Sequence, residues 1–204
     1  MAHPVYPARM ERSVIMRANT KIKGKIVLLG DGAVGKTSLI RRYVLDYFKD
    51  EYIQTIGTKV TKKEIQVTAR DNQIVDATLM IWDIMGQRDY YRKHIRQFDK
   101  YQPQTKFYLG AKGALVVSDI SRKTTLESLP LWVDSIFETE GEVPLIFLAN
   151  KSDLLDEYEY SFEDLGAFAR QYNAPAFLTS AKTGENVDVA FYKLGEAMIN
   201  NVLR

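Results

Sequence analysis

The sequence contains no cysteine among its 204 residues, and its only histidines are His3 and His94. Without thiols the chain can hold no disulfide framework, no cysteine-ligated zinc and no thiol nucleophile, and two imidazoles are too few for a multi-histidine metal site. The same absence predicts that neither palmitoyl nor prenyl groups anchor the chain, and Ala2 in the second position predicts that it is not myristoylated.

Long hydrophobic runs are also missing. The longest hold four or five residues, as at 145–149, whereas a membrane-spanning helix needs about 18 or more, and the N-terminus lacks the apolar segment of a secretory signal. Lys and Arg number 28 and Asp and Glu 26, a net charge of +2, which gives no electrostatic argument for binding nucleic acid. We therefore expect a cytoplasmic protein that has no nucleic-acid partner.

The composition of the chain is that of a globular domain, with 46% hydrophobic and 26% charged residues. Its length suggests about one domain with additions. Residues 1–24 are basic and show no clear period, which indicates an N-terminal arm that is flexible in part. The arm is either a plain solvated tail or a docking segment for an anionic lipid or a partner.

From Lys25 onward, short apolar runs alternate with amphipathic segments. Strands are expected at 26–29, 60–67, 77–82, 114–117, 145–149 and 176–178, and helices at 38–47, 124–138, 162–172 and 187–203. Fully apolar runs are typical of strands buried on both faces. This order predicts an α/β fold whose six-stranded, mostly parallel sheet carries helices on both faces. In the first helix, Leu39, Tyr43 and Leu45 are expected to face inward.

A complete phosphate-loop pattern, GxxxxGKT, begins at Gly30 and lies between an expected strand and an expected helix. In such a loop, backbone N–H groups and the helix N-terminus point at phosphate oxygens. Lys36 is expected to reach the β- and γ-phosphates, and the Thr37 hydroxyl is expected to bind Mg²⁺. The predicted nucleotide-binding residues here are Gly30, Asp31, Gly32, Ala33, Val34, Gly35, Lys36, Thr37 and Ser38.

A second motif, Asn150-Lys151-Ser152-Asp153, follows an expected buried strand, where ligands bind in open α/β sheets. The Asp153 carboxylate can accept hydrogen bonds from N1–H and the 2-amino group of guanine. Adenine offers neither donor, so the motif favours guanine over adenine. An ATPase on the same fold is the alternative, in which Asp153 has another role. After the last strand, Ser180, Ala181 and Lys182 are expected to cap the base edge from the other side.

A third motif, Asp83-Ile84-Met85-Gly86-Gln87, closes the second long apolar strand of the pattern. Asp83 suits a further contact to Mg²⁺, through water, and Gly86 lets a backbone N–H approach the γ-phosphate. Gln87 is the candidate for orienting the attacking water. The alternative is an ordinary strand-to-loop turn.

Together these motifs resemble those of the Ras-superfamily small GTPases, in particular Rab-like and Ras-like members, over about residues 25–204. The resemblance implies a P-loop NTPase G domain, GTP and GDP as ligands, Mg²⁺ as metal ion and a slow GTPase activity. Thr55 stands eighteen residues after Thr37, at the position of the switch I threonine. Phe48 matches the aromatic residue that packs against guanine. The implied metal ligands are Thr37, Thr55 and Asp83, and the implied catalytic residues are Gln87, Lys36 and Thr55.

The sequence departs from the family pattern in three places. Ile84-Met85 stands where the family usually has Thr-Ala, which leaves open a constitutive nucleotide-bound scaffold beside a working switch. An insertion near 88–106 is basic and aromatic, and is either an extended switch II helix or a docking surface. The chain carries no C-terminal cysteine, so we expect no lipid anchor and only peripheral membrane contact. We expect a monomer that works with effectors, an exchange factor and an activating protein.

Overall fold

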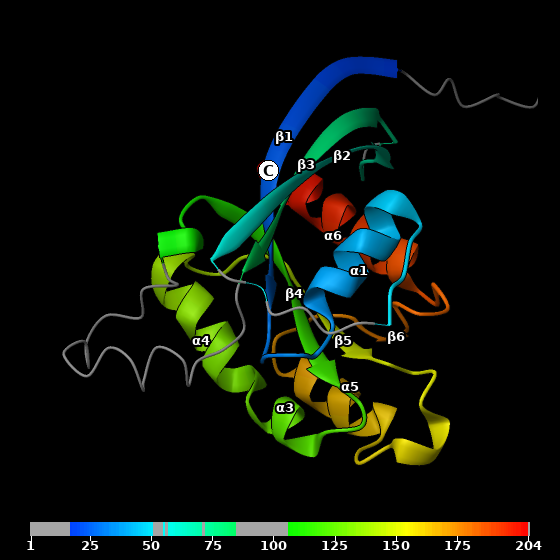
Figure 1. The fold of residues 1–204 in the computed structure, drawn as a ribbon. Helices are drawn as coiled ribbons and strands as arrows, with labels where there is room; N and C mark the ends of the chain where they lie inside the picture. The colour runs from blue at the N-terminus through cyan, green and yellow to red at the C-terminus, as the bar shows by residue number, and fades with distance from the viewer. Residues whose placement is uncertain (1–16, 51–54, 56, 71, 85–105, 204) are drawn as a thin grey trace, which may run out of the picture.

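A computed structural model describes residues 17–50, 55, 57–70, 72–84 and 106–203 (Figure 1). Its elements are, in order, β1 (Arg17–Leu29), α1 (Lys36–Leu45), β2 (Thr58–Thr68), β3 (Ile74–Ile84), β4 (Ala111–Asp119), α3 (Lys123–Glu127), α4 (Leu129–Glu140), β5 (Leu145–Asn150), the 3-10 turn η2 (Leu155–Glu157), α5 (Phe162–Arg170), β6 (Ala176–Thr179) and α6 (Val187–Val202). Within these described ranges, no helix is both long and apolar enough to cross a membrane.

The six strands form one sheet in the order β2-β3-β1-β4-β5-β6. Strands β3, β1, β4, β5 and β6 are parallel to one another, and β2 alone is antiparallel, because a tight turn joins it to β3. In this turn Asn72 adopts a left-handed backbone with φ of 62°, and Ala69 N–H donates to the Gln73 carbonyl. The parallel strands are joined by crossovers that contain the helices. The predicted six-stranded α/β fold is thereby confirmed.

Helices cover both faces of the sheet, as predicted (Figure 1). Helices α1 and α6 pack on one face, where the rings of Tyr43 and Phe191 stack with centroids 4.1 Å apart. Helices α4 and α5 pack on the other face, where Trp132 is almost completely buried. Because β5 lies between these two layers, all six of its residues are buried, which explains the apolar run of its first five residues.

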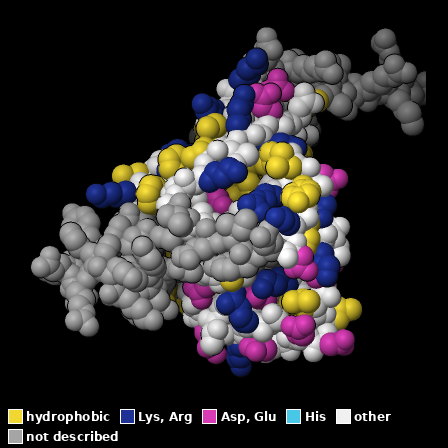
Figure 2. Space-filling view, viewed as in Figure 1, with side chains coloured by type: hydrophobic (Ala, Val, Ile, Leu, Met, Phe, Trp, Pro, Cys, Tyr) yellow, Lys and Arg dark blue, Asp and Glu magenta, His cyan; other side chains and the backbone are white. Residues whose placement is uncertain are grey.

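Charged side chains of both signs are interspersed over the face of the molecule seen in Figure 2, and its hydrophobic side chains form small groups. This mixture agrees with the small net charge of +2. Over the described part of this face, therefore, no large field of one sign steers a ligand or partner.

The first strand begins earlier than the sequence predicts. We expected the ordered pattern to start at Lys25, but β1 begins at Arg17, and residues 21–24 already pair with β3. Polar, basic residues form a strand here because β3 extends far enough to satisfy their backbone hydrogen bonds. Gly24 also leaves room for Met198 of α6, since a Cβ at this position would collide with the Met198 sulfur.

Two further expectations on helices are wrong. The segment 124–138 is not one helix but two, α3 and α4, which are separated at Ser128. Pro130 has no N–H to donate to the preceding turn, so a new helix starts there. Leu45 does not face inward but is 68% exposed. It lies two positions after the buried Tyr43, which places it on the opposite side of a helix with 3.6 residues per turn.

Candidate functional site

The carboxyl ends of the five parallel strands meet at one edge of the sheet. Leu28, just before the phosphate loop, lies beside Asp83 of β3, and Asp119 of β4 lies beside Asn150 of β5, which in turn pairs with Thr179 of β6. After β1 the chain adds β2 and β3 on one side of β1 within the sheet, and from β4 onward it adds β5 and β6 in the opposite direction. This edge is therefore a topological switch point, where open α/β sheets bind their ligands.

Glycine is required at both ends of the phosphate loop. Gly30 has φ of 132°, and a Cβ there would collide with the Val117 carbonyl oxygen. Gly35 has φ of 97°, and a Cβ there would collide with the Asn150 amide. Both conformations are accessible to glycine but strained for other residues, so the loop's shape depends on the glycines of the motif.

Lys36 is buried inside this loop. Its Nζ donates to the carbonyl oxygens of Gly30, at 2.6 Å, and Asp31, at 2.7 Å. Burial lowers the pKa of Lys36 to about 8, although the nearby carboxylates of Asp83 and Asp31 oppose this shift. A desolvated ammonium group that is held by carbonyl oxygens can stabilise an anionic ligand strongly, because little water screens it.

The three predicted metal ligands lie together. Thr37 Oγ1 donates a 2.6 Å hydrogen bond to Asp83 Oδ2 and lies 2.8 Å from Thr55 Oγ1. Asp83 Oδ1 is buried and has no hydrogen-bond partner among the described residues. Burial raises the pKa of Asp83 above its ordinary value, against the Thr37 hydrogen bond and the Lys36 charge. A carboxylate oxygen without a partner beside two hydroxyls is a donor set that fits Mg²⁺, which prefers oxygen ligands.

The residues predicted to recognise a base also converge. Ser180 Oγ donates to Asp153 Oδ1 at 2.6 Å, and Lys182 Nζ lies 3.9 Å from Asp153 Oδ2. The amide of Asn150 bridges the two loops, since its Nδ2 donates to the Val34 carbonyl and its Oδ1 accepts from Ala181 N–H. The Asn150–Asp153 motif and the Ser180–Lys182 segment therefore form one structure with the phosphate loop.

Of the other predicted residues, the structure describes Phe48 and Lys151 but not Gly86 and Gln87. Phe48 is partly buried against the core cluster beneath α1. Lys151 adopts a left-handed backbone with φ of 68°, and its Nζ lies 2.6 Å from Asp119 Oδ2. Gly86 and Gln87, together with most of the insertion near 88–106 and the arm before Arg17, lie outside the described residues.

Two side chains, Arg42 and Asp31, hold these loops in place by hydrogen bonds that the sequence motifs did not predict. Arg42 of α1 donates from Nε to the Ala181 carbonyl at 2.8 Å and from Nη2 to the Lys182 carbonyl at 2.7 Å. The carboxylate of Asp31 accepts from Ser128 Oγ at 2.8 Å and from Trp132 Nε1 at 2.9 Å. Each anchor joins segments far apart in the sequence, so no local pattern reveals it.

A glycine-dependent phosphate loop at the switch point of such a sheet defines a P-loop nucleotide-binding protein. The profile of the Ras family matches residues 25–200. The Ras-related protein RABA1f of Arabidopsis thaliana is 36% identical over 82% of this chain and 70% of its own length. Rab11B of Nicotiana tabacum is 36% identical over the same shares, and Rab-13 of Bos taurus is 32% identical over 86% of this chain and 79% of its own.

The chain belongs to the Ras family, and the three relatives named above are Rab proteins. It therefore has the general character of a small GTPase: a protein that binds GTP and GDP with Mg²⁺, hydrolyses GTP and works with regulators and effectors. The predicted resemblance to Rab-like members of the Ras superfamily is confirmed.

Proposed function

We propose that this protein is a GTP-dependent switch with slow intrinsic hydrolysis, which signals through switch I around Thr55 and switch II from Gly86 onward. The observation that supports it best is the cluster of Thr37, Thr55 and Asp83. Thr55 lies between α1 and β2, outside any regular element. A contact from such a segment to the Mg²⁺ ligands gives a direct way for the γ-phosphate to order switch I.

In this proposal each residue of the site has a separate task. Lys36 neutralises the β- and γ-phosphates, and Thr37, Thr55 and Asp83 hold the Mg²⁺ ion. Bound Mg²⁺ supplies positive charge that neutralises phosphate oxygens. Asp153 selects guanine through N1–H and the 2-amino group, with Ser180, Ala181 and Lys182 at the base edge. Gln87 orients the attacking water.

A slow rate follows from the missing arginine. Neither the phosphate loop nor residues 48–58 contain one. In phosphoryl transfer an arginine that stabilises the transition state contributes about 10³–10⁵ in rate. We therefore propose that an activating protein supplies it, and that an exchange factor and effectors complete the cycle of a cytoplasmic monomer that contacts membranes peripherally.

A second candidate is a constitutive nucleotide-bound scaffold. Ile84 is 3% exposed and packs into the core cluster beneath α4. This apolar anchor stands directly before Met85 and Gly86, where a switch must move. A firmly packed residue at that point favours restricted motion of switch II.

Single-turnover hydrolysis of Mg²⁺·GTP, measured for the wild type and Gln87→Leu, tests the switch. We expect slow turnover by the wild type and its loss in the variant. Limited proteolysis with GDP and with a non-hydrolysable GTP analogue then separates the two candidates, since the switch predicts different cleavage patterns. Identical patterns, with tight binding of both nucleotides, would support the scaffold instead.

A further inference from the structure

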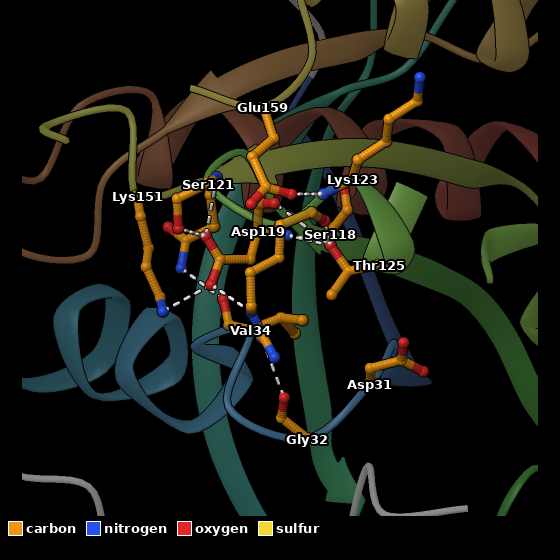
Figure 3. A network of polar contacts seen from close by, with 12 residues as sticks. Asp31, Gly32, Val34, Ser118, Asp119, Ser121, Lys123, Thr125, Lys151 and Glu159 are labelled. Carbon is orange, nitrogen blue, oxygen red and sulfur yellow. Dashed lines mark hydrogen bonds and ion pairs between the residues drawn. The ribbon is translucent and has the colours of Figure 1, made fainter. Parts of the chain in front are cut away.

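Asp119, at the end of the central strand β4, carries one of the most deeply buried carboxylates of the protein, with a side chain that is 1% exposed. Figure 3 shows it at the centre of a polar network between the phosphate loop and the loop after β5. Its Oδ1 accepts from the backbone N–H of Ser121, at 3.1 Å, and from the Ser121 hydroxyl, at 2.7 Å. One carboxylate oxygen is thus held within its own turn, which fixes the orientation of the group.

The other oxygen binds two cations that come from different directions. Asp119 Oδ2 lies 2.6 Å from Lys151 Nζ and 2.9 Å from Arg122 Nε. Burial by itself would raise the pKa of Asp119, but the hydrogen bonds from Lys151, Ser121 and Arg122 lower it below its ordinary value. The group is therefore an anion with both oxygens satisfied, as a buried charge requires.

Each cation leads to a different part of the nucleotide site. Lys151 belongs to the Asn150–Asp153 motif and holds a left-handed backbone, which is strained for a residue with a side chain. Arg122 uses a second nitrogen, Nη2, to donate to the Gly32 carbonyl at 3.0 Å. The path from Gly32 through Arg122 and Asp119 to Lys151 is continuous and consists of charged hydrogen bonds.

We infer that Asp119 is a positioning residue, which locks the guanine-binding loop to the phosphate loop through Lys151 and Arg122 and so slows nucleotide release. The inference rests on the proposed function of the site. Arginine suits the bridging position because its rigid fork presents separate nitrogens to two acceptors, whereas lysine presents a single point charge. Removing the Asp119 charge leaves two cations without their anion and breaks this link between the loops, so that the hydrogen bond from Asn150 to the Val34 carbonyl must hold them without it.

The rate at which fluorescent GDP dissociates from the full chain in Mg²⁺ tests this inference. Asp119→Asn should release GDP about tenfold faster or more, since a hydrogen bond to a charged group is lost. Glu159→Gln is the matched control, because Glu159 belongs to the same network (Figure 3) but its carboxylate accepts from Lys123 N–H of α3. We expect this control to release GDP at the wild-type rate.

Variants of Arg122 test whether its side chain positions the two loops or only neutralises the charge of Asp119. Its side chain is 39% exposed, so Arg122→Gln and Arg122→Lys keep the fold even if Asp119→Asn does not. Both should release GDP faster than the wild type, because lysine cannot contact Asp119 and Gly32 together. The double variant Asp119→Asn/Arg122→Gln should be no faster than Asp119→Asn, because Arg122 acts through Asp119.

Three results would overturn parts of this scheme in distinguishable ways. A wild-type rate in Asp119→Asn, or in Arg122→Gln where the Asp119 variant does not fold, would overturn the inference. A wild-type rate in Arg122→Lys would show that Arg122 only neutralises charge, and would overturn the link to the phosphate loop. A wild-type chain that binds no GDP would overturn the proposed function itself.

Discussion

The Thr37 hydroxyl donates a 2.6 Å hydrogen bond to Asp83 Oδ2, although the two residues are 46 positions apart in the sequence. Thr37 is the second residue of α1, the helix after the phosphate loop, and Asp83 stands near the end of β3. Within the part of the chain that the structure describes, the second carboxylate oxygen of Asp83 is buried without a hydrogen-bond partner. Such an oxygen is costly unless a ligand contacts it, so the pair is built to gain from a bound cation.

Replacing Asp83 by asparagine therefore tests the proposed Mg²⁺ site. We expect Mg²⁺ affinity to fall about 10–100-fold, the cost of losing a partner that contacts the metal ion through its bound ligands. GDP release should become fast in Mg²⁺ and respond little to added chelator. The matched control is Asp76→Asn, on the same strand but hydrogen-bonded to Gln66. An unchanged response to chelator in Asp83→Asn would contradict the assignment.

Base selection depends on Asp153. Asp153→Ala should weaken GTP binding by about 2–5 kcal/mol, the range for breaking a desolvated, charge-assisted pair, and should leave the weak binding of ATP unchanged. Competition titrations with both nucleotides measure this. Asp156→Ala, in the exposed turn η2, removes a nearby carboxylate and serves as control. If GTP and ATP lost affinity equally, the ATPase interpretation of the fold would be favoured.

Arg42 holds the backbone of the loop at Ala181 and Lys182 by two hydrogen bonds. In Arg42→Gln both are weakened, and we expect GDP release to rise several-fold, in line with about 0.5–1.5 kcal/mol per hydrogen bond. Asp46→Asn removes only the ion pair of Arg42 with a 92% exposed carboxylate and should have little effect. Equal release rates in both variants and the wild type would show that the loop holds its shape without Arg42.

The stability of the core should depend on pH through Tyr43. The pKa of the Tyr43 hydroxyl is raised from 10.0 to about 12. Burial is the larger cause of this shift, and the negative charge of Asp188 is the smaller one. Between these values the unfolded chain binds fewer protons than the folded one, so the free energy of unfolding falls as pH rises. Below pH 10 the raised pKa of Tyr43 makes its full contribution to the free energy of unfolding, and by pH 11 about 1 kcal/mol of that contribution is lost.

Tyr43→Phe removes this titration while it retains the ring that stacks on Phe191. Urea unfolding at pH 8 and pH 11 should therefore reveal a smaller loss of stability in the variant than in the wild type. The values at pH 8 provide the baseline for each protein. An equal loss in both proteins would contradict the assigned shift.

Motifs with a fixed spacing made much of the site predictable. The phosphate loop, Asp83, Asn150 and Ser180 each stand at the end of a strand or directly after it, so a prediction of parallel strands already places them at one edge. The buried strands were equally accessible, because burial on both faces leaves an unbroken apolar run.

What could not be predicted depends on partners distant in the sequence. The first half of β1 is polar and forms a strand only because β3 extends beside it. Asp119, Arg122 and Arg42 belong to no pattern, and their importance comes from contacts with loops that begin elsewhere. The break at Ser128 had a local signal in Pro130, but the apolar spacing around it suggested one continuous helix.

The length of β1 also gives the protein a mechanical property. The strand extends from Arg17 to Leu29, with a register shift against β3 between Arg17 and Lys21, and the phosphate loop begins at the next residue. It is hydrogen-bonded along β3, and from Lys25 onward along β4 as well. Tension on the chain before Arg17 would load these bonds in shear, so that many must break together before the loop moves. A tether at that end could therefore pull on the protein without opening its nucleotide site.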